Sequence, residues 1–554
     1  MKTRNPKREK EVPAQAKQFK FRRDATIGSA DAETDERFLG KCFVSTGDLD
    51  ALLDCSDPKR IVVGRTGAGK SALLKVIKDS EENVIDLPPE TLSLNYVANS
   101  DVIQFFEAAG VKLDIFYSLL WRHVFAVELL KKKYHITNES SKSTFLEKMA
   151  YLFKRDKHKE RAIRYLEEWG EKFWQETEYR IKEFTTKLES ELRASVGEKL
   201  PGISLDASAA NRLTADQKQE VIHKGQRIVN EVQIRDLNEV INLLADEIFT
   251  DPQHRYYVTI DRLDENWVEE RLRYKLIRAL IETIRSFQRI RSVKIVVALR
   301  LDLIERVIKA TRDAGFQEEK YESLYLRIRW TKNQLEELLD KRIAVLVREQ
   351  YTTHAARLRD ILPDRINSKA AVDYILDRTL LRPRDAILFI NACLERAEGR
   401  PALTATLISD AEADYSRKRL RSLADEWSGT YVHLGQYANL LEGRTYPFRL
   451  GTISKEQLDN CLLELCATCS PPCHDPICRA AAEYIDGARS PNNMLIALAR
   501  VFYHIGLIGI KPDGGSAVKW SLDGETISEG QLKPSSQIYV HPMFWRCFGV
   551  TDQR

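Results

Sequence analysis

The hydrophobic pattern of the chain predicts three buried strands separated by helical segments. The strands are Ile61–Val63, Tyr256–Ile260 and Val293–Leu299, and each is an apolar run rather than a regular alternation of apolar and polar residues. Such runs are typical of strands in a parallel sheet that is covered on both faces. The segment Glu269–Ile290 between the last two strands has helical periodicity. The pattern therefore predicts an α/β fold with a parallel sheet.

Other segments extend this outline. Tyr325–Trp330 alternates and predicts a fourth strand. Residues 99–250 form a long helical insertion, in which Phe116–His123 is expected to rejoin the core, and residues 332–430 are helical again. One repeat in the insertion places apolar residues three and four positions apart: Ile181, Phe184, Leu188 and Leu192.

The last part of the chain, residues 431–554, has shorter elements. The predicted elements are helices at Lys455–Ala467, Arg479–Asp486 and Pro491–Ile505 and strands at Ala517–Leu522 and Gln537–Val540. Three helices followed by a hairpin-like pair of strands suggest a winged-helix module.

The residues that follow the first strand have the spacing of a phosphate-binding loop. They are Gly64, Arg65, Thr66, Gly67, Ala68, Gly69, Lys70 and Ser71. A helical pattern comes next, so the order is strand, loop, helix, which is the context that this motif requires. Its glycines let the backbone direct N–H groups at phosphate oxygens, and the helix N-terminus favours an anion. Lys70 is expected to reach the β- and γ-phosphates of ATP, and the Ser71 hydroxyl to bind Mg²⁺.

Charged residues end the second and third strands. Asp261 follows the second strand, where it can hold Mg²⁺ through water opposite the phosphate loop. Arg300 follows the third strand, and ligands of parallel sheets bind at the carboxyl ends of the strands. Arg300 is therefore a candidate sensor of the γ-phosphate, with a structural salt bridge as the equal alternative.

Taken together, the motifs resemble those of bacterial P-loop ATPases of the AAA+/STAND/KAP-like group, several of which act in antiphage defence. The motifs are GRTGAGKSALL at 64–74, YYVTIDRLDENW at 256–267, KIVVALRLDL at 294–303, LRIRW at 326–330, LRPRDAI at 381–387 and VHPMFW at 540–545. The resemblance covers most of residues 25–400. It implies a helical lid after the core and, in oligomeric relatives, an arginine that reaches the neighbour's nucleotide.

The resemblance assigns roles to several residues of this sequence. Arg382, Pro383 and Arg384 stand where the lid of such ATPases contacts nucleotide, and Arg327 or Arg329 stands where the arginine of a neighbour acts.

The sequence departs from the group at the expected base. Relatives that hydrolyse ATP briskly carry an acid directly after the strand-end Asp, and here that position is Arg262. Asp264 or Glu265 must then serve as base, with Asp264 slightly favoured because Asp-x-x-Asp spacing recurs in KAP-like proteins. Hydrolysis is expected to be slow and switch-like.

Composition adds limits. The 554 residues include 86 basic and 82 acidic ones, a net charge of +4, which does not by itself indicate nucleic acid. Residues 1–24 form a basic stretch that is expected to be disordered, with a nucleic-acid-binding arm as the alternative. No apolar run approaches the roughly 20 residues that span a bilayer, and the N-terminus lacks the apolar region of a secretory signal. A cytoplasmic protein without a membrane partner is expected, with its cysteines reduced.

A cysteine cluster near the C-terminus is a candidate zinc site. Its residues are Cys466, Cys469, Cys473 and Cys478. Zinc takes four Cys or His ligands, and C-x-x-C is a common half-site. The alternative is a set of buried thiols without metal, because cysteine is among the most buried residue types.

The predicted domains follow from these motifs. They are a disordered basic arm (1–24), a P-loop ATPase core (25–98 and 251–331), a helical insertion (99–250), a helical lid (332–430) and a winged-helix-like domain with the cysteine cluster (431–554).

The expected function is an ATP-binding, Mg²⁺-dependent and slowly hydrolysing regulatory ATPase. It is expected to form a homo-oligomer and to control a partner effector in bacterial antiphage defence, an expectation that rests on the resemblance. One alternative is a DNA-associated loader or remodeller of the AAA+ type that uses the winged helix, and another is a nucleotide-binding scaffold with little turnover. No nuclease, protease, kinase or deaminase motif is found, so toxic chemistry is assigned to a partner.

Overall fold

The computed structural model divides the chain into two compact units. The sheet unit is Ser45–Arg329, and the terminal unit combines Met1–Val44 with Trp330–Arg554. Each unit has its own hydrophobic core. The structure describes residues 19–92, 100–153, 157–169, 186, 190, 194, 210–231, 233–312, 318–351, 356–469 and 474–552. Most of the predicted basic arm, residues 1–18, lies outside the described residues.

A five-stranded parallel sheet forms the centre of the sheet unit. Its strands are β1 (Ile61–Gly64), β2 (Val84–Asp86), β3 (Tyr256–Ile260), β4 (Val293–Arg300) and β5 (Tyr325–Arg327). The order is β2-β3-β4-β1-β5, with every neighbouring pair parallel. Val62 faces Ala298 of β4 and Leu326 of β5, so β1 lies inside the sheet. The predicted α/β fold with a parallel sheet is confirmed.

The four predicted strands of the sheet are present, but β5 is shorter than Tyr325–Trp330 and β2 was not predicted. Strand β2 is an edge strand of three residues that pairs only with β3, and only Ile85 of its side chains is buried. So short a segment leaves no periodicity to read in the sequence.

Helices cover this sheet with regular apolar faces. Those that contact strands include α2 (Asp48–Leu53), α3 (Lys70–Ser80), α13 (Glu270–Phe287) and α14 (Leu301–Thr311). Helix α13 buries side chains at helical spacing: Leu276, Leu280, Ile284 and Phe287. Spacing of three and four residues places them on one face, which packs into the core of the unit.

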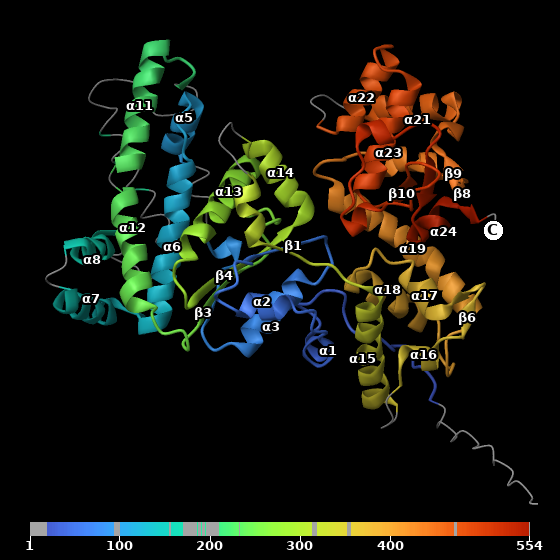
Figure 1. Ribbon diagram of the computed structural model, residues 1–554, viewed down its shortest axis with the longest axis horizontal. Helices are drawn as coiled ribbons and strands as arrows, with labels where there is room; N and C mark the ends of the chain where they lie inside the picture. Colours follow the sequence, from blue (N-terminus) through green and yellow to red (C-terminus); the bar gives the residue numbers. More distant parts are fainter. Residues whose placement is uncertain are drawn as a thin grey trace, which may run out of the picture. The chain divides into compact units, whose positions relative to one another are not determined.

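The insertion is helical and joins the core of the sheet unit. Its helices are α5 (Asp101–Ala109), α6 (Asp114–Tyr134), α7 (Glu139–Phe153), α8 (Lys157–Trp169), α11 (Ala215–Glu231) and α12 (Gln233–Leu243). Helices α6 and α12 run side by side (Figure 1). Trp121 of α6 donates its indole N–H to the Leu276 carbonyl of α13 at 2.9 Å, as expected for a segment that rejoins the core. The predicted repeat from Ile181 to Leu192 lies outside the described residues.

The terminal unit contains the predicted lid region. Its helices in residues 332–430 are α15 (Lys332–Gln350), α16 (Leu358–Ile361), α17 (Ala371–Leu376), α18 (Pro383–Leu394) and α19 (Ala405–Trp427), with a hairpin of β6 (Arg365–Ile366) and β7 (Lys369–Ala370). Residues 25–44, including α1 (Glu36–Cys42), belong to this unit and not to the P-loop core with which the sequence analysis grouped them. Buried Arg342 explains this placement, because it pairs with Asp35 and donates to the Ile27 carbonyl at 2.8 Å.

The end of the chain folds as helices and a small antiparallel sheet. The helices are α20 (Leu434–Tyr437), α21 (Lys455–Thr468), α22 (Pro476–Ile485), α23 (Pro491–His504) and α24 (Trp545–Phe548). Strands β9 (Phe448–Arg449), β10 (Ile508–Lys511) and β11 (Gln537–Val540) form the sheet in the order β10-β11-β9, and β8 (Thr445–Tyr446) pairs with β12 (Thr551–Asp552). Helix α21, helix α23 and strand β11 agree closely with the predicted elements.

One predicted strand is wrong. The partner of β11 is β10 (Ile508–Lys511), not Ala517–Leu522, in which Lys519 makes only a single bridge to Ile510. The Trp520 ring packs on Gly509, where an added Cβ would lie 2.6 Å from it. The alternating pattern of Ala517–Leu522 thus reflects a segment that covers β10 rather than a strand of its own.

Among the described residues, no helix is both long enough and apolar enough to span a membrane.

Candidate nucleotide site

The phosphate loop connects β1 to α3 and is shaped by its glycines. Gly67 and Gly69 have φ of +79° and +100°, a left-handed backbone that side chains disfavour. At Gly64 the constraint is space rather than backbone conformation, because an added Cβ would lie 3.1 Å from the Cβ of Ala68. Helix α3 begins at Lys70, so the loop ends on a helix N-terminus, where free N–H groups attract anions.

Lys70 and Ser71 open this helix. The Lys70 ammonium donates to the carbonyls of Gly64 and Arg65, both at 3.1 Å, so it lies over the loop itself. Lys70 and Ser71 are half-buried. Arg65, Thr66 and Ala68 lie between the glycines, and Ala68 donates its N–H to the Arg65 carbonyl at 3.1 Å.

Asp261 lies at the carboxyl edge of the same sheet. It follows β3, and only β4 separates β3 from β1. Parallel strands end on one edge, so the phosphate loop and Asp261 share that edge. The sheet unit has the fold of a P-loop NTPase.

Arg262 marks an irregular turn directly after Asp261. Its φ is +59°, which is uncommon for a residue other than glycine, and such strain clusters at functional sites. The Asp261 carboxylate accepts the Arg262 N–H at 2.8 Å, and Glu265 donates its N–H to the Arg262 carbonyl at 3.1 Å. The Arg262 side chain is exposed and lies 3.9 Å from the Glu265 carboxylate.

Buried Arg273 of α13 holds this turn in place, and the sequence analysis missed it. Its guanidinium donates to the carbonyls of Asp264 and Glu265 at 3.3 and 2.8 Å and to the Asn266 side chain at 3.2 Å. The sequence contained one indication that Arg273 is buried: it directly follows Leu272, which is also buried, at the apolar face of the helix.

Arg300, at the end of β4, lies between two carboxylates. Its guanidinium is 3.1 Å from Asp264 and 2.9 Å from Asp302, which is itself buried and also pairs with Arg306. Burial lowers the pKa of Arg300, but Asp302 and Asp264 outweigh it and raise the pKa overall. The structural salt bridge is therefore present, and the guanidinium stands at the edge that carries the phosphate loop.

Glu265 has a different environment from Asp264. Partial burial raises the pKa of Glu265. A hydrogen bond with Glu90 and repulsion between the two carboxylates raise it further, whereas the positive charge of Arg262 lowers it. Glu90 comes from the segment after β2, so this partner could not be read from the local sequence.

The other predicted nucleotide contacts belong to the end of β5 and to the terminal unit. Arg329 is exposed just past β5, and Arg327 of β5 pairs with Glu322 at 2.8 Å. Arg382 belongs to the terminal unit, where it is buried and pairs with Asp385 at 2.8 Å.

A second carboxylate completes the surroundings of Arg382. Its guanidinium is 2.9 Å from Glu426, and Asp385 also pairs with Arg419 at 3.3 Å. Arg384 is less buried and pairs with exposed Asp31. The contacts of both arginines with nucleotide stay predictions.

The cysteine cluster differs from the predicted set. Cys469 and Cys478 lie together, Cys466 is not part of the group, and Cys473 lies outside the described residues. His433 is the third member, and it is far from the cysteines in the sequence. Cys466 belongs to helix α21, whereas Cys469 follows the end of that helix. C-x-x-C spacing therefore does not bring its two thiols to one ligand group here.

Comparison with known proteins adds relatives of low similarity. Residues 333–424 match the family model described as the FunZ-associated C-terminal helical domain. An 80.3 kDa protein of Escherichia coli (strain K12) that is named for transposon gamma-delta is 20% identical over 530 residues. The match covers 94% of this chain and 66% of the relative, so this chain spans just under two thirds of the relative's length.

Two solved structures are also similar. The Walker-type ATPase of Pyrococcus abyssi has 11% identity and a TM-score of 0.34, with 91% of this chain and 94% of that chain covered. The ORC2 protein of Aeropyrum pernix, solved with ADPNP and ADP, has 12% identity and a TM-score of 0.33, with 92% and 95% covered. The fold is assigned from the parallel sheet and phosphate loop of this chain itself.

Proposed function

We propose that the chain is a cytoplasmic, ATP-binding regulatory ATPase that hydrolyses ATP slowly and controls a partner effector, in bacterial antiphage defence. The observation that carries the ATPase part is the phosphate loop, which stands on the same sheet edge as Asp261. The loop fits a phosphate chain because it ends on a helix N-terminus and is tightly turned, with the backbone of Gly67 and Gly69 left-handed and a Cβ at Gly64 crowding that of Ala68 at 3.1 Å.

The residues at this edge also fit Mg²⁺. The ion prefers oxygen ligands and keeps several waters, and it would neutralise phosphate charge when bound. Ser71 would offer its hydroxyl and Asp261 a carboxylate held by the Arg262 N–H. Lys70 would bind the β- and γ-phosphates as a point charge after leaving the carbonyls of Gly64 and Arg65.

Slow hydrolysis is supported by the residues around the acidic turn. The position directly after Asp261 carries Arg262, which cannot act as a base. The Asp264 carboxylate is paired with Arg300 at 3.1 Å, whereas Glu265 is more exposed and has a raised pKa. We therefore assign the base to Glu265 and a role in positioning Arg300, the γ-phosphate sensor, to Asp264.

Oligomerisation is part of the proposal because Arg329 is exposed just past β5, the edge strand that pairs with β1, the strand that leads into the phosphate loop. An arginine from a neighbouring copy can stabilise charge that develops on the γ-phosphate. The effector is assigned to another protein because the sequence carries no toxic catalytic motif of its own.

A DNA-associated loader or remodeller is the second candidate. Helices α21, α22 and α23 are followed by the antiparallel pair β10 and β11, which supports a winged-helix module in which β10 takes the place of the predicted strand Ala517–Leu522. The E. coli relative is named for a transposon, which also favours a DNA substrate.

ATP turnover with and without DNA separates the two candidates. For a regulatory ATPase we expect slow turnover that exceeds that of Asp261→Ala and is unchanged by duplex or single-stranded DNA. Stimulation of several-fold by DNA would instead support the loader. Turnover equal to that of Asp261→Ala under all conditions would contradict both and leave a nucleotide-binding scaffold.

A further inference from the structure

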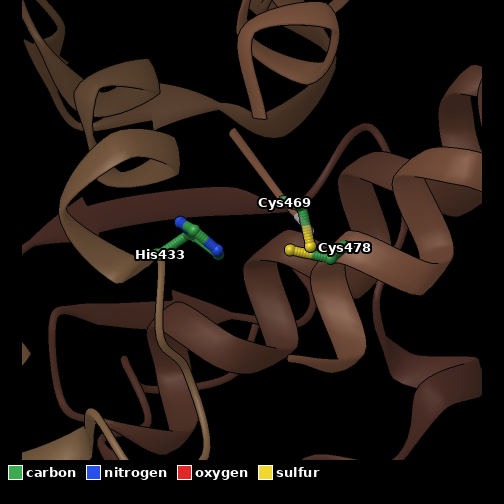
Figure 2. A group of neighbouring side chains, drawn as sticks. All are labelled: His433, Cys469 and Cys478. Carbon is green, nitrogen blue, oxygen red and sulfur yellow. The ribbon is translucent and has the colours of Figure 1, made fainter. Parts of the chain in front are cut away.

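We propose that His433, Cys469 and Cys478 hold a structural zinc ion in the terminal unit. Their ligand atoms, one ring nitrogen and two sulfurs, all lie within 4.8 Å of one another (Figure 2). Cys478 is buried, and His433 and Cys469 are half-buried. The proposal concerns an ion that holds the fold together and is independent of the nucleotide site.

The donor set selects the metal. Thiolate and imidazole ligands favour zinc, whereas magnesium and calcium prefer oxygen. Zinc–sulfur and zinc–nitrogen bonds of about 2.3 and 2.1 Å in a tetrahedron place neighbouring ligand atoms roughly 3.5–3.8 Å apart. The observed upper limit of 4.8 Å is close enough for small side-chain rotations to close the site.

Three separate elements bring the ligands together. His433 directly precedes α20, Cys469 directly follows α21, and Cys478 lies in the first turn of α22. Helix α21 packs against both α20 and α22. An ion at this point would therefore link all three of these elements of the terminal unit.

Three hydrogen bonds set the positions of these elements. Buried Asp475 accepts the His433 N–H at 3.1 Å with one carboxylate oxygen and the Ile477 N–H at 2.9 Å with the other. It therefore ties the backbone of His433 to the start of the helix that carries Cys478. The Thr468 hydroxyl donates to the Gln436 side chain at 3.1 Å and ties the end of α21 to α20. The ligands are thus arranged by the fold before any ion binds.

Zinc content of the full-length protein, purified without chelator, tests the site. We expect about one zinc per chain, held by these three side chains with a water molecule in the fourth tetrahedral position. His433→Ala, Cys469→Ser and Cys478→Ser should each lose it. Cys466→Ser is the matched control and should keep its zinc, because Cys466 is a neighbouring half-buried cysteine outside the group. Circular dichroism checks that each variant is folded.

Cobalt substitution gives a second readout that does not depend on the stability of the variants. Cobalt in the wild-type site should show the charge-transfer absorption of thiolate ligands and the visible bands of a tetrahedral site, and Cys469→Ser should weaken the thiolate absorption. A chelator should lower the melting temperature of the wild type and of Cys466→Ser but not that of Cys469→Ser, because metal binding contributes to folding.

Several results would overturn the proposal. They are wild-type protein without zinc and without a cobalt spectrum, zinc retained at wild-type level in Cys469→Ser and Cys478→Ser, or zinc lost only in Cys466→Ser. A Cys469–Cys478 disulfide in freshly purified protein, detected by peptide mass mapping without reductant, would also overturn it.

Discussion

Asp264 and Glu265 are adjacent carboxylates in different surroundings. Asp264 shares a partly buried ion pair with Arg300, and Glu265 is more exposed and lies near Glu90. The Arg273 guanidinium holds the backbone of both residues. Their side chains can therefore be changed singly without releasing the turn that presents them.

Glu265→Gln should bind ATP like the wild type and hydrolyse it at least roughly 100-fold more slowly, because the amide cannot accept the proton of the attacking water. Asp264→Asn weakens the ion pair with Arg300, so it should lower turnover, and it should also lower the melting temperature because the free energy of unfolding falls by about 1 kcal/mol. Turnover is measured beside thermal unfolding. If both variants unfold at lower temperature but turn over ATP at the wild-type rate per folded molecule, the carboxylates only support the turn and neither is the base.

The raised pKa of Glu265 predicts a pH dependence. A base must be deprotonated, so turnover should rise with pH through a pKa above the ordinary value of 4.5. Glu90→Gln removes a like charge and a hydrogen bond, so the rise should move to lower pH. The contribution of Glu265 to stability has the opposite pH dependence. Between its unfolded pKa and its raised folded pKa, the native state binds more protons than the unfolded state, so the free energy of unfolding falls as pH rises. A pH–rate profile that is identical in wild type and Glu90→Gln would contradict this account.

At this scale the sequence predicts local motifs and misses long-range partners. Gly64, Lys70 and Ser71 lie within eight consecutive residues that connect a strand to a helix. Their spacing alone therefore identifies the phosphate loop. Glu90 and Arg273 reach the acidic turn from elements that are distant in the chain, and His433 reaches the cysteines in the same way. Nothing in the sequence near these residues indicates which partner they meet.

Among the elements of the terminal unit, the start of α18 depends on charge. Fully buried Asp385 accepts the Leu380 N–H at 3.1 Å and pairs with Arg382, which also pairs with Glu426. Burial raises the pKa of Asp385, but Arg382 and Arg419 outweigh it and lower the pKa overall. The stability from this carboxylate is therefore present above its unfolded pKa and is lost as pH falls through the lower, folded pKa.

Arg382→Ala should destabilise the protein by about 3–5 kcal/mol, because it leaves buried carboxylates without their counter-charge. Arg384→Ala is the control, since it removes an arginine two residues away whose partner is exposed Asp31, and it should cost less than about 1 kcal/mol. Urea unfolding measures both. Wild-type stability of Arg382→Ala together with weakened ATP binding would reverse the assignment and favour the nucleotide contact that the resemblance implies.

The elements themselves were predicted where their patterns are long. Continuous apolar runs predicted β1, β3 and β4 almost to the residue, because strands buried on both faces leave that signal. Edge strand β2 is too short to leave one, and Ala517–Leu522 alternates because it packs over β10. The order of strands in the sheet follows from tertiary packing, which no single segment records.

At the scale of the whole molecule, the division into two units corrects one predicted domain boundary, that of the P-loop core. Residues 25–44 are adjacent in sequence to the phosphate loop but belong to the terminal unit, because Asp35 and Ile27 contact buried Arg342 of α15. Contacts that are more than 300 residues apart in the chain cannot be inferred from local pattern.

Assembly into oligomers predicts complementation between inactive proteins. Arg329→Ala should reduce turnover by about 10³-fold if this arginine acts on the nucleotide of a neighbour. Mixed with Lys70→Ala, it should recover part of the activity, because a mixed oligomer combines an intact loop with an intact arginine. Arg327→Ala is the control, since Arg327 pairs with Glu322 of its own chain. Co-assembled variants that recover no activity would contradict a shared site.

Calorimetric titration with Mg·ATP tests the central claim, nucleotide binding by the loop at residues 64–71, most directly. Lys70→Ala removes charge-assisted contacts worth about 1.5–3 kcal/mol, so its affinity should fall roughly tenfold to a hundredfold or more. Lys78→Ala removes a lysine from the same helix that pairs with Asp86, and it should bind like the wild type. Equal affinity of the wild type and Lys70→Ala would contradict the assignment of the site.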